Sequence, residues 1–177
     1  MTPKVFILYA FLCLTWGTTW LALKISLNYI PPIFGLGLRF TISSIILWAI
    51  LLRQKPKINK SSTAIKVYLS FSLLSFVAAY SLTYWGAQFI YSSLASIIWA
   101  LLPIFVSIVA HFILPSEPLT LRRFGGGLFG LAGIAVILSS NEGEKEVQLI
   151  GVLAIFLAVA LAAGPNVYLK KHHKIVN

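Results

Sequence analysis

The chain has 177 residues, of which 59% are hydrophobic and 10% are charged, and its mean hydropathy is +0.91. Soluble domains carry about 25% charged residues and disordered chains have low hydrophobicity, so both classes are excluded. The net charge of +10 could indicate nucleic-acid binding, but the basic residues lie between long apolar runs instead of on one polar face. The composition predicts an integral membrane protein whose surroundings are the lipid bilayer, with no nucleic acid as partner.

Six apolar stretches follow one another along the chain, each close to the roughly 20 residues that cross a bilayer as a helix. They cover 5–23, 32–52, 67–87, 93–114, 124–139 and 149–169. Prolines, glycines and asparagines lie between several of them, as is typical of turns. We therefore expect an all-α, polytopic membrane bundle of six transmembrane helices, in which the sixth helix is packed less completely than the others.

Lysines and arginines gather in alternate loops. Five lie between the second and third stretches, Arg122 and Arg123 lie between the fourth and fifth, and three follow the sixth, whereas the other loops are nearly free of cations. Because cytoplasmic loops carry the excess of Lys and Arg, the pattern places both termini in the cytoplasm. The expected location is the cell membrane (plasma or inner), as a multi-pass protein.

Several short motifs follow one another in a characteristic order. They are Trp16-Gly17-Thr18-Thr19-Trp20 with Lys24, then Pro31-Pro32, Leu38-Arg39-Phe40, Leu101-Leu102-Pro103 and Glu117-Pro118-Leu119-Thr120. In this order they resemble the EamA-type half of the drug/metabolite transporter superfamily, whose members have ten helices in two five-helix repeats. An odd number of helices per repeat inserts the second copy upside down, so the resemblance implies half of an inverted-repeat transporter.

The resemblance divides the chain into three parts. Residues 5–140 would form a five-helix EamA-like repeat, 147–170 the first helix of an incomplete second repeat, and 171–177 a basic cytoplasmic tail. The glycine-glutamate pair of the family reads Ser116-Glu117 here. With four helices of the second repeat missing, we expect a truncated member, a fragment, or a subunit that pairs with another copy as a homo-oligomer or with a complementing second half.

The function that the resemblance implies is membrane transport of a small-molecule substrate that is amino-acid-like or drug-like, and we expect the direction to be export. The alternative is a non-transporting membrane subunit or an inactive fragment. No enzyme, cofactor or metal site is expected, because the chain lacks Asp and its four glutamates all lie in loops.

The glycine-rich run 125–130 fits the dinucleotide-binding pattern G-x-G-x-x-G, but it begins a membrane helix and follows no strand, so we do not expect it to bind a cofactor. Gly126 and Gly130 instead have the G-x-x-x-G spacing of close helix contacts.

Arg39 lies about two turns inside the second stretch, where a charge is costly and usually faces a cavity. It is the candidate for binding a carboxylate or phosphate of the substrate, with Lys24 as a second, and the alternative for each is a structural cation that bonds helix-end carbonyls. Aromatic and hydroxyl side chains at helical spacing are typical of a cavity for a small organic solute, although helix packing or interfacial anchoring explains each of them equally well. The expected substrate-binding residues are Arg39, Trp16, Thr19, Trp20, Tyr80, Tyr84 and Trp99.

This topology is tested by reporter fusions at Lys57 and Lys145. We expect a cytoplasmic signal at Lys57, because basic loops stay inside, and an external signal at Lys145. The predicted topology is contradicted if a fusion at Lys57 gives the signal of a reporter that is active only outside the cytoplasm.

Overall fold

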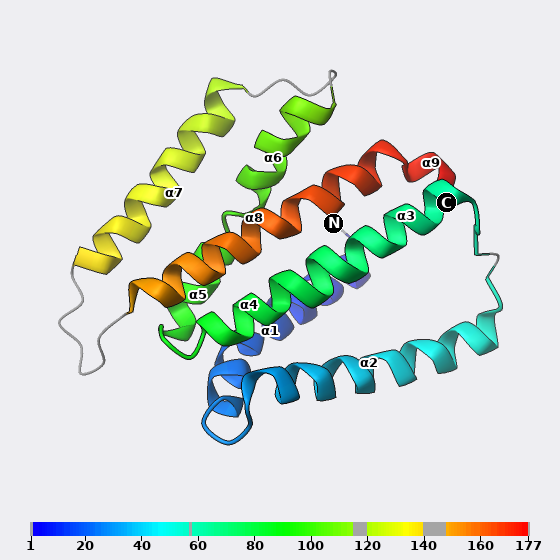
Figure 1. Ribbon diagram of the computed structural model, residues 1–177, viewed down its shortest axis with the longest axis horizontal. Coiled ribbons are helices and arrows are strands. Elements are labelled where there is room, and N and C mark those ends of the chain that lie inside the picture. Colours follow the sequence, from blue (N-terminus) through cyan, green and yellow to red (C-terminus); the bar gives the residue numbers. More distant parts are fainter. Residues whose placement is uncertain (1, 57, 115–119, 140–147, 177) are drawn as a thin grey trace.

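The computed structural model describes residues 2–56, 58–114, 120–139 and 148–176. This part of the chain is helical and contains no strand, which confirms the all-α membrane bundle (Figure 1). The helices are α1 (Pro3–Ser26), α2 (Pro32–Gln54), α3 (Ser62–Ser70), η1 (Phe71–Ala79), α4 (Tyr80–Gly86), α5 (Ser92–Trp99), α6 (Leu102–Ile113), α7 (Leu121–Ser139), α8 (Leu149–Lys171) and α9 (His173–Val176).

Five helical segments in the described residues are long and apolar enough to cross a bilayer. They are α1, α2, the continuous segment Ser62–Gly86, the segment Ser92–Ile113, and α8. The remaining expected stretch forms α7, a helix of 19 residues whose apolar part, Gly125–Val136, is shorter, so its crossing stays a prediction. The residues outside the described ranges include Lys57, Ser116, Glu117 and Lys145, which the sequence analysis names.

The third span changes its helical type halfway along. It begins as the α-helix α3, continues through nine residues of π-helix in η1, and returns to α-helical geometry in α4. Neither Gly nor Pro occurs between Phe71 and Ala79. π-helical turns are rare and often occur at functional sites, and here the wide turns immediately precede Tyr80.

The fourth span is interrupted, as the proline in its middle predicts. α5 ends at Trp99 and α6 begins at Leu102, with a turn at Ala100 and Leu101 between them. Pro103 has no N–H to donate to the preceding turn of the helix, and its ring would collide with the carbonyl group of that turn. At the break the chain forms a tighter turn, in which the N–H of Leu101 donates to the Ile98 carbonyl at 3.1 Å.

The sixth expected helix, α8, is the most buried of the membrane-length helices, so the expectation that it packs least completely is wrong. Of its apolar stretch, 56% is buried, against 0% for α1 and 6% for α2. α8 packs against the whole third span and against α5 and α6 (Figure 1). The reason is its small-residue face, since Ala158, Ala162 and Ala163 are fully or almost fully buried and allow close approach.

The backbones of α4 and α8 come into close contact. A methyl group on Gly151 would stand 2.8 Å from the carbonyl oxygen of Gly86, and one on Gly86 would stand 3.0 Å from the carbonyl oxygen of Gly151. The expected G-x-x-x-G contact through Gly126 is wrong, because Gly126 faces open space. Gly127 and Gly130 approach the α5–α6 junction instead, meeting Ile104 and Leu101, since residues three apart share a helix face.

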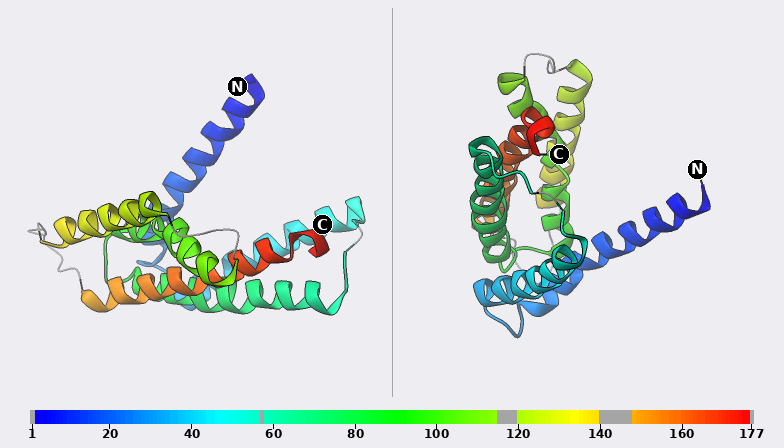
Figure 2. Two further views of the ribbon diagram at one scale, coloured as in Figure 1. Left: turned by 90° about the horizontal axis from the view of Figure 1, so that it is seen from above. Right: turned by 90° about the vertical axis from the view of Figure 1, so that its right-hand side faces the viewer.

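α1 and α2 form a hairpin that is held to the other helices mainly at one end. α1 packs against α5 and α2 packs against α4, while the N-terminal part of α1 extends away from the bundle (Figure 2). The apolar side chains of that part are largely exposed, including Phe6, Phe11 and Trp16 at more than 60%. The hairpin therefore presents apolar faces that no described residue covers.

The α4–α8 contact is tested with Gly151→Ala. The new methyl group would overlap the Gly86 carbonyl, and overpacking costs about 1–3 kcal/mol, which exceeds the roughly 1 kcal/mol that Ala gains over Gly in helix propensity. We expect a lower thermal midpoint for the purified protein in detergent. Gly133→Ala is the matched control, because nothing lies within 4 Å of that position, and it should not lower the midpoint.

Candidate functional site

Six of the seven expected binding residues surround one small cavity between α1, α2, α4 and α5. The cavity has a volume of about 30 Å³, room for little more than one water molecule. Two residues that the sequence analysis missed, Leu23 and Thr83, complete its lining. The other lining residues are Trp16, Thr19, Trp20, Arg39, Tyr80 and Trp99. We call this space the aromatic chamber.

Rings and hydroxyls fix the walls of the aromatic chamber. The ring of Trp99 lies 6.4 Å from that of Trp20 and 5.7 Å from that of Tyr80, centroid to centroid. The indole N–H of Trp99 donates to Thr83 Oγ1 at 3.1 Å, and the Thr83 hydroxyl donates to the Ala79 carbonyl at 2.8 Å. The Thr19 hydroxyl donates to the Thr15 carbonyl, so the two threonines do not have a free hydroxyl proton to offer to a ligand.

Arg39 turns toward α4. Its Nη1 donates to the Tyr84 hydroxyl at 3.3 Å, and its guanidinium carbon lies 6.0 Å from the centre of the Tyr80 ring. All four glutamates fall outside the described residues, so within the described ranges the guanidinium has no carboxylate to pair with. Tyr84, the seventh expected residue, is buried and lies beside the chamber.

Space for a solute lies on either side of Arg39. Between α1 and α2 is a space of about 400 Å³ that Arg39, Thr19 and Tyr84 help to line. Between α2 and η1 is another of about 570 Å³, which we call the α2–η1 cavity. Its lining consists of Arg39, Phe40, Ser43, Ser44, Leu47, Ser72, Phe76, Val77 and Tyr80. Both volumes fall in the range of small-molecule sites, about 300–1,000 Å³.

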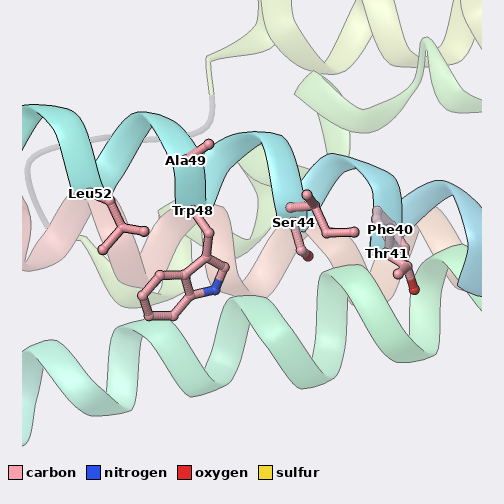
Figure 3. A pocket seen from close by; sticks show the side chains of 7 residues that line it. Phe40, Thr41, Ser44, Trp48, Ala49 and Leu52 are labelled. Carbon is pink, nitrogen blue, oxygen red and sulfur yellow. The ribbon is translucent and has the colours of Figure 1, made fainter.

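A further space of about 590 Å³ follows α2 alone, toward its C-terminal end. Ser44, Trp48 and Leu52, four residues apart, turn to the same side of α2 (Figure 3). Because Phe40 and Ser44 also line the α2–η1 cavity, the two spaces adjoin along α2. The side of α2 that faces η1 is thus open along much of its length.

Lys24, the second candidate cation, has a structural position. Its ammonium donates to the carbonyls of Ala87 and Ile90 at 2.6 Å each and to that of Gln88 at 3.2 Å. The N–H of Gln148 donates to the remaining carbonyl of this loop, that of Phe89, at 3.1 Å. Lys24 therefore supplies hydrogen bonds to the carbonyl groups after the end of α4 and in the loop before α5. It does not line the aromatic chamber or the cavities beside it.

The α2–η1 cavity was not predicted from the sequence, although the spacing of its lining residues was visible there. Arg39, Ser43 and Leu47 are four residues apart on α2, and Ser72, Phe76 and Tyr80 are four apart on the third span. Gln88, which continues the spacing of Tyr80 and Tyr84, lies beyond the end of α4, and its side-chain amide donates to the Trp85 carbonyl. The sequence alone could not show that the helices separate enough to leave a cavity.

The fold and the site together define a polytopic membrane protein with solute-sized cavities around an arginine between its helices. The chain belongs to the EamA-like transporter family, whose model matches residues 4–139. No solved structure matches the chain.

Curated relatives agree with this family. The chain is 30% identical over 165 residues to the uncharacterized transporter YoaV of Bacillus subtilis, covering 93% of the chain and 56% of that protein. It is 31% identical over 156 residues to an uncharacterized transporter of Buchnera aphidicola, covering 88% of the chain and 52% of that protein. It is 29% identical over 165 residues to the protein PagO of Salmonella typhimurium, covering 90% of the chain and 53% of that protein. The chain thus spans about half the length of these relatives.

The role of Lys24 is tested with Lys24→Met. Loss of the ammonium leaves loop carbonyls without their partner, which costs about 1–3 kcal/mol for a buried group, so the thermal midpoint should fall. Lys24→Arg should recover part of the loss because it keeps the charge and the donors. Lys66→Met, on an exposed lysine of α3, is the control, and an equal fall there would show that the effect is not specific to the loop.

Proposed function

We propose that the chain acts in the export of small metabolites, either amino-acid-like or drug-like compounds. The observation that carries this proposal is the convergence of Arg39 with the rings of Trp20, Tyr80 and Trp99 around adjoining cavities. A cation at membrane depth is expensive unless it faces a cavity, a partner or a ligand. Membership of a transporter family supports transport as the use of that cavity.

Export is supported by the way in which the α1–α2 hairpin opens. The positive-inside rule puts the N-terminus of α1 and the C-terminus of α2 on the cytoplasmic side. These are the ends away from Lys24 and the loop carbonyls that it holds, and the N-terminal part of α1 extends clear of the bundle (Figure 2). A hairpin whose cytoplasmic ends lie apart from the bundle leaves room for a cytoplasmic solute to enter, and the location that we propose is the plasma or inner membrane.

The exposed apolar faces of α1 and α2 are suited to packing against another group of membrane helices. None of the apolar stretch of α1 is buried, and transporter sites of this kind lie at the interface between two repeats. We therefore propose that the hairpin packs against either a complementing second half or a second copy of the chain. One relative, 25% identical over 129 residues, is named an S-adenosylmethionine/S-adenosylhomocysteine transporter of Chlamydia muridarum, which makes S-adenosylmethionine a useful probe.

The proposal is tested by uptake into energised, inverted membrane vesicles that contain the chain. In these vesicles the cytoplasmic side faces the medium, so an exporter accumulates its substrate inside. The probes are labelled L-phenylalanine, L-methionine, S-adenosylmethionine and ethidium. We expect accumulation of at least one probe, and we expect Arg39→Leu to reduce it about 10-fold or more, because charge-assisted hydrogen bonds contribute about 1.5–3 kcal/mol.

Arg53→Leu is the matched control, since Arg53 lies on the same helix and is exposed outside the described cavities. It should transport as the unchanged chain does. Accumulation only in right-side-out vesicles contradicts export. If no probe accumulates above the level of empty vesicles, the chain is better described as a non-transporting membrane subunit.

A further inference from the structure

We propose that the α2–η1 cavity binds a small organic monocarboxylate with an aromatic or apolar body. This inference rests on the proposed function and adds the chemical class of the substrate and the place where it binds. It follows from four features of the cavity: its cation, the number of its charges, its hydroxyl groups and its ring surfaces.

The cation of the cavity is incompletely bonded. A guanidinium has five N–H donors, and among the described residues Arg39 uses one of them, in the 3.3 Å bond to the Tyr84 hydroxyl. The Tyr80 ring lies under it at 6.0 Å. At membrane depth an arginine needs an anion, water or carbonyls, and its planar fork matches a carboxylate with two parallel hydrogen bonds.

The site supplies one positive charge. Lys24, the nearest other candidate, is bound to the carbonyls of Ala87, Gln88 and Ile90. Within the described residues, no other lysine, arginine or histidine lines the aromatic chamber or the cavities that adjoin it. A phosphate monoester carries about −1.5 to −2 charges and would leave excess negative charge in an apolar site, whereas a carboxylate is matched by Arg39 alone.

Hydroxyl groups that can bond a carboxylate face the same cavity. Ser44 and Ser72 line it from opposite helices, and within the described part of the chain neither hydroxyl has a hydrogen-bond partner. Ser43 differs, because its hydroxyl donates to the Arg39 carbonyl at 2.8 Å. Two available hydroxyls beside a guanidinium provide the few placed polar groups that fix the orientation of a ligand in a mostly apolar site.

Ring surfaces form the remaining wall. Phe76 and Tyr80 are stacked with an interplanar angle of 15° and a centroid distance of 6.1 Å, and Phe40 meets both rings edge-on at 5.5 and 5.4 Å. Such a wall favours a flat or apolar ligand body. The 400 Å³ space on the other side of Arg39 offers a single ring, that of Tyr84, in a lining that is otherwise mainly aliphatic, and the aromatic chamber, at about 30 Å³, is too small.

The experiment uses three probes of similar size that differ in charge. They are indole-3-acetate, an anion, indole-3-acetamide, which is neutral, and tryptamine, a cation, and binding is measured by calorimetry with the purified chain in lipid nanodiscs. We expect indole-3-acetate to bind at least 10-fold more tightly than either analogue. Arg39→Gln should weaken its binding about 10- to 100-fold and leave the weak binding of the amide unchanged, whereas Arg53→Gln should change neither.

Two filling variants locate the site. Ser72→Leu fills the α2–η1 cavity and should weaken indole-3-acetate binding about 10-fold or more, whereas Ala22→Leu, which fills the 400 Å³ space, should leave it intact. The reverse result, or undetectable binding of indole-3-acetate to the unchanged chain, overturns the inference. Tighter binding of tryptamine also overturns it. Export of ethidium in the vesicle assay would then still support the proposed function, so the two failures are distinguishable.

Discussion

The contact between the backbones of α4 and α8 determines the positions of the other helices. Apolar side chains have no hydrophobic reason to associate in lipid, so membrane helices associate through close packing. Gly86 and Gly151 allow the two helices to touch without intervening side chains, and the buried alanines of α8 extend the contact toward η1. With the third span fixed in this way, Tyr80 and Tyr84 are held in place, and these residues in turn orient Arg39.

The helix positions could be predicted because membrane thickness dictates the length of an apolar run. The break in the fourth span was equally accessible, since Pro103 cannot complete the helical bonding there. The degree of packing was not predicted correctly. α8 was expected to pack least completely, although Gly151, Ala158 and Ala162 already indicated a face for close contact. The π-helix was not predicted, because the residues from Phe71 to Ala79 include no Gly or Pro that would mark a departure from the α-helix.

The site could be predicted in part. Helical spacing brings Tyr80 and Tyr84 to one face of α4, and an arginine inside an apolar run indicates a cavity. Bonding to helix-end carbonyls was the stated alternative for Lys24, but the particular carbonyls could not be foreseen, because they lie more than sixty residues away and every residue carries such a group. The cavity volumes could not be predicted either, since they depend on how far α2 leans away from η1. Neither helix carries that information in its own sequence.

The π-helix determines which way the second half of the third span faces. A π-turn contains more residues than an α-turn, so the nine residues of η1 rotate everything that follows them relative to α3. A return of these nine residues to α-helical pitch would therefore act at a distance. Tyr80 and Tyr84 would turn away from Arg39 while the composition of the helix stayed the same. The rotational register of this span is thus a property of the site, because η1 sets the direction of Tyr80 and Tyr84 as well as contributing its own residues to the α2–η1 cavity.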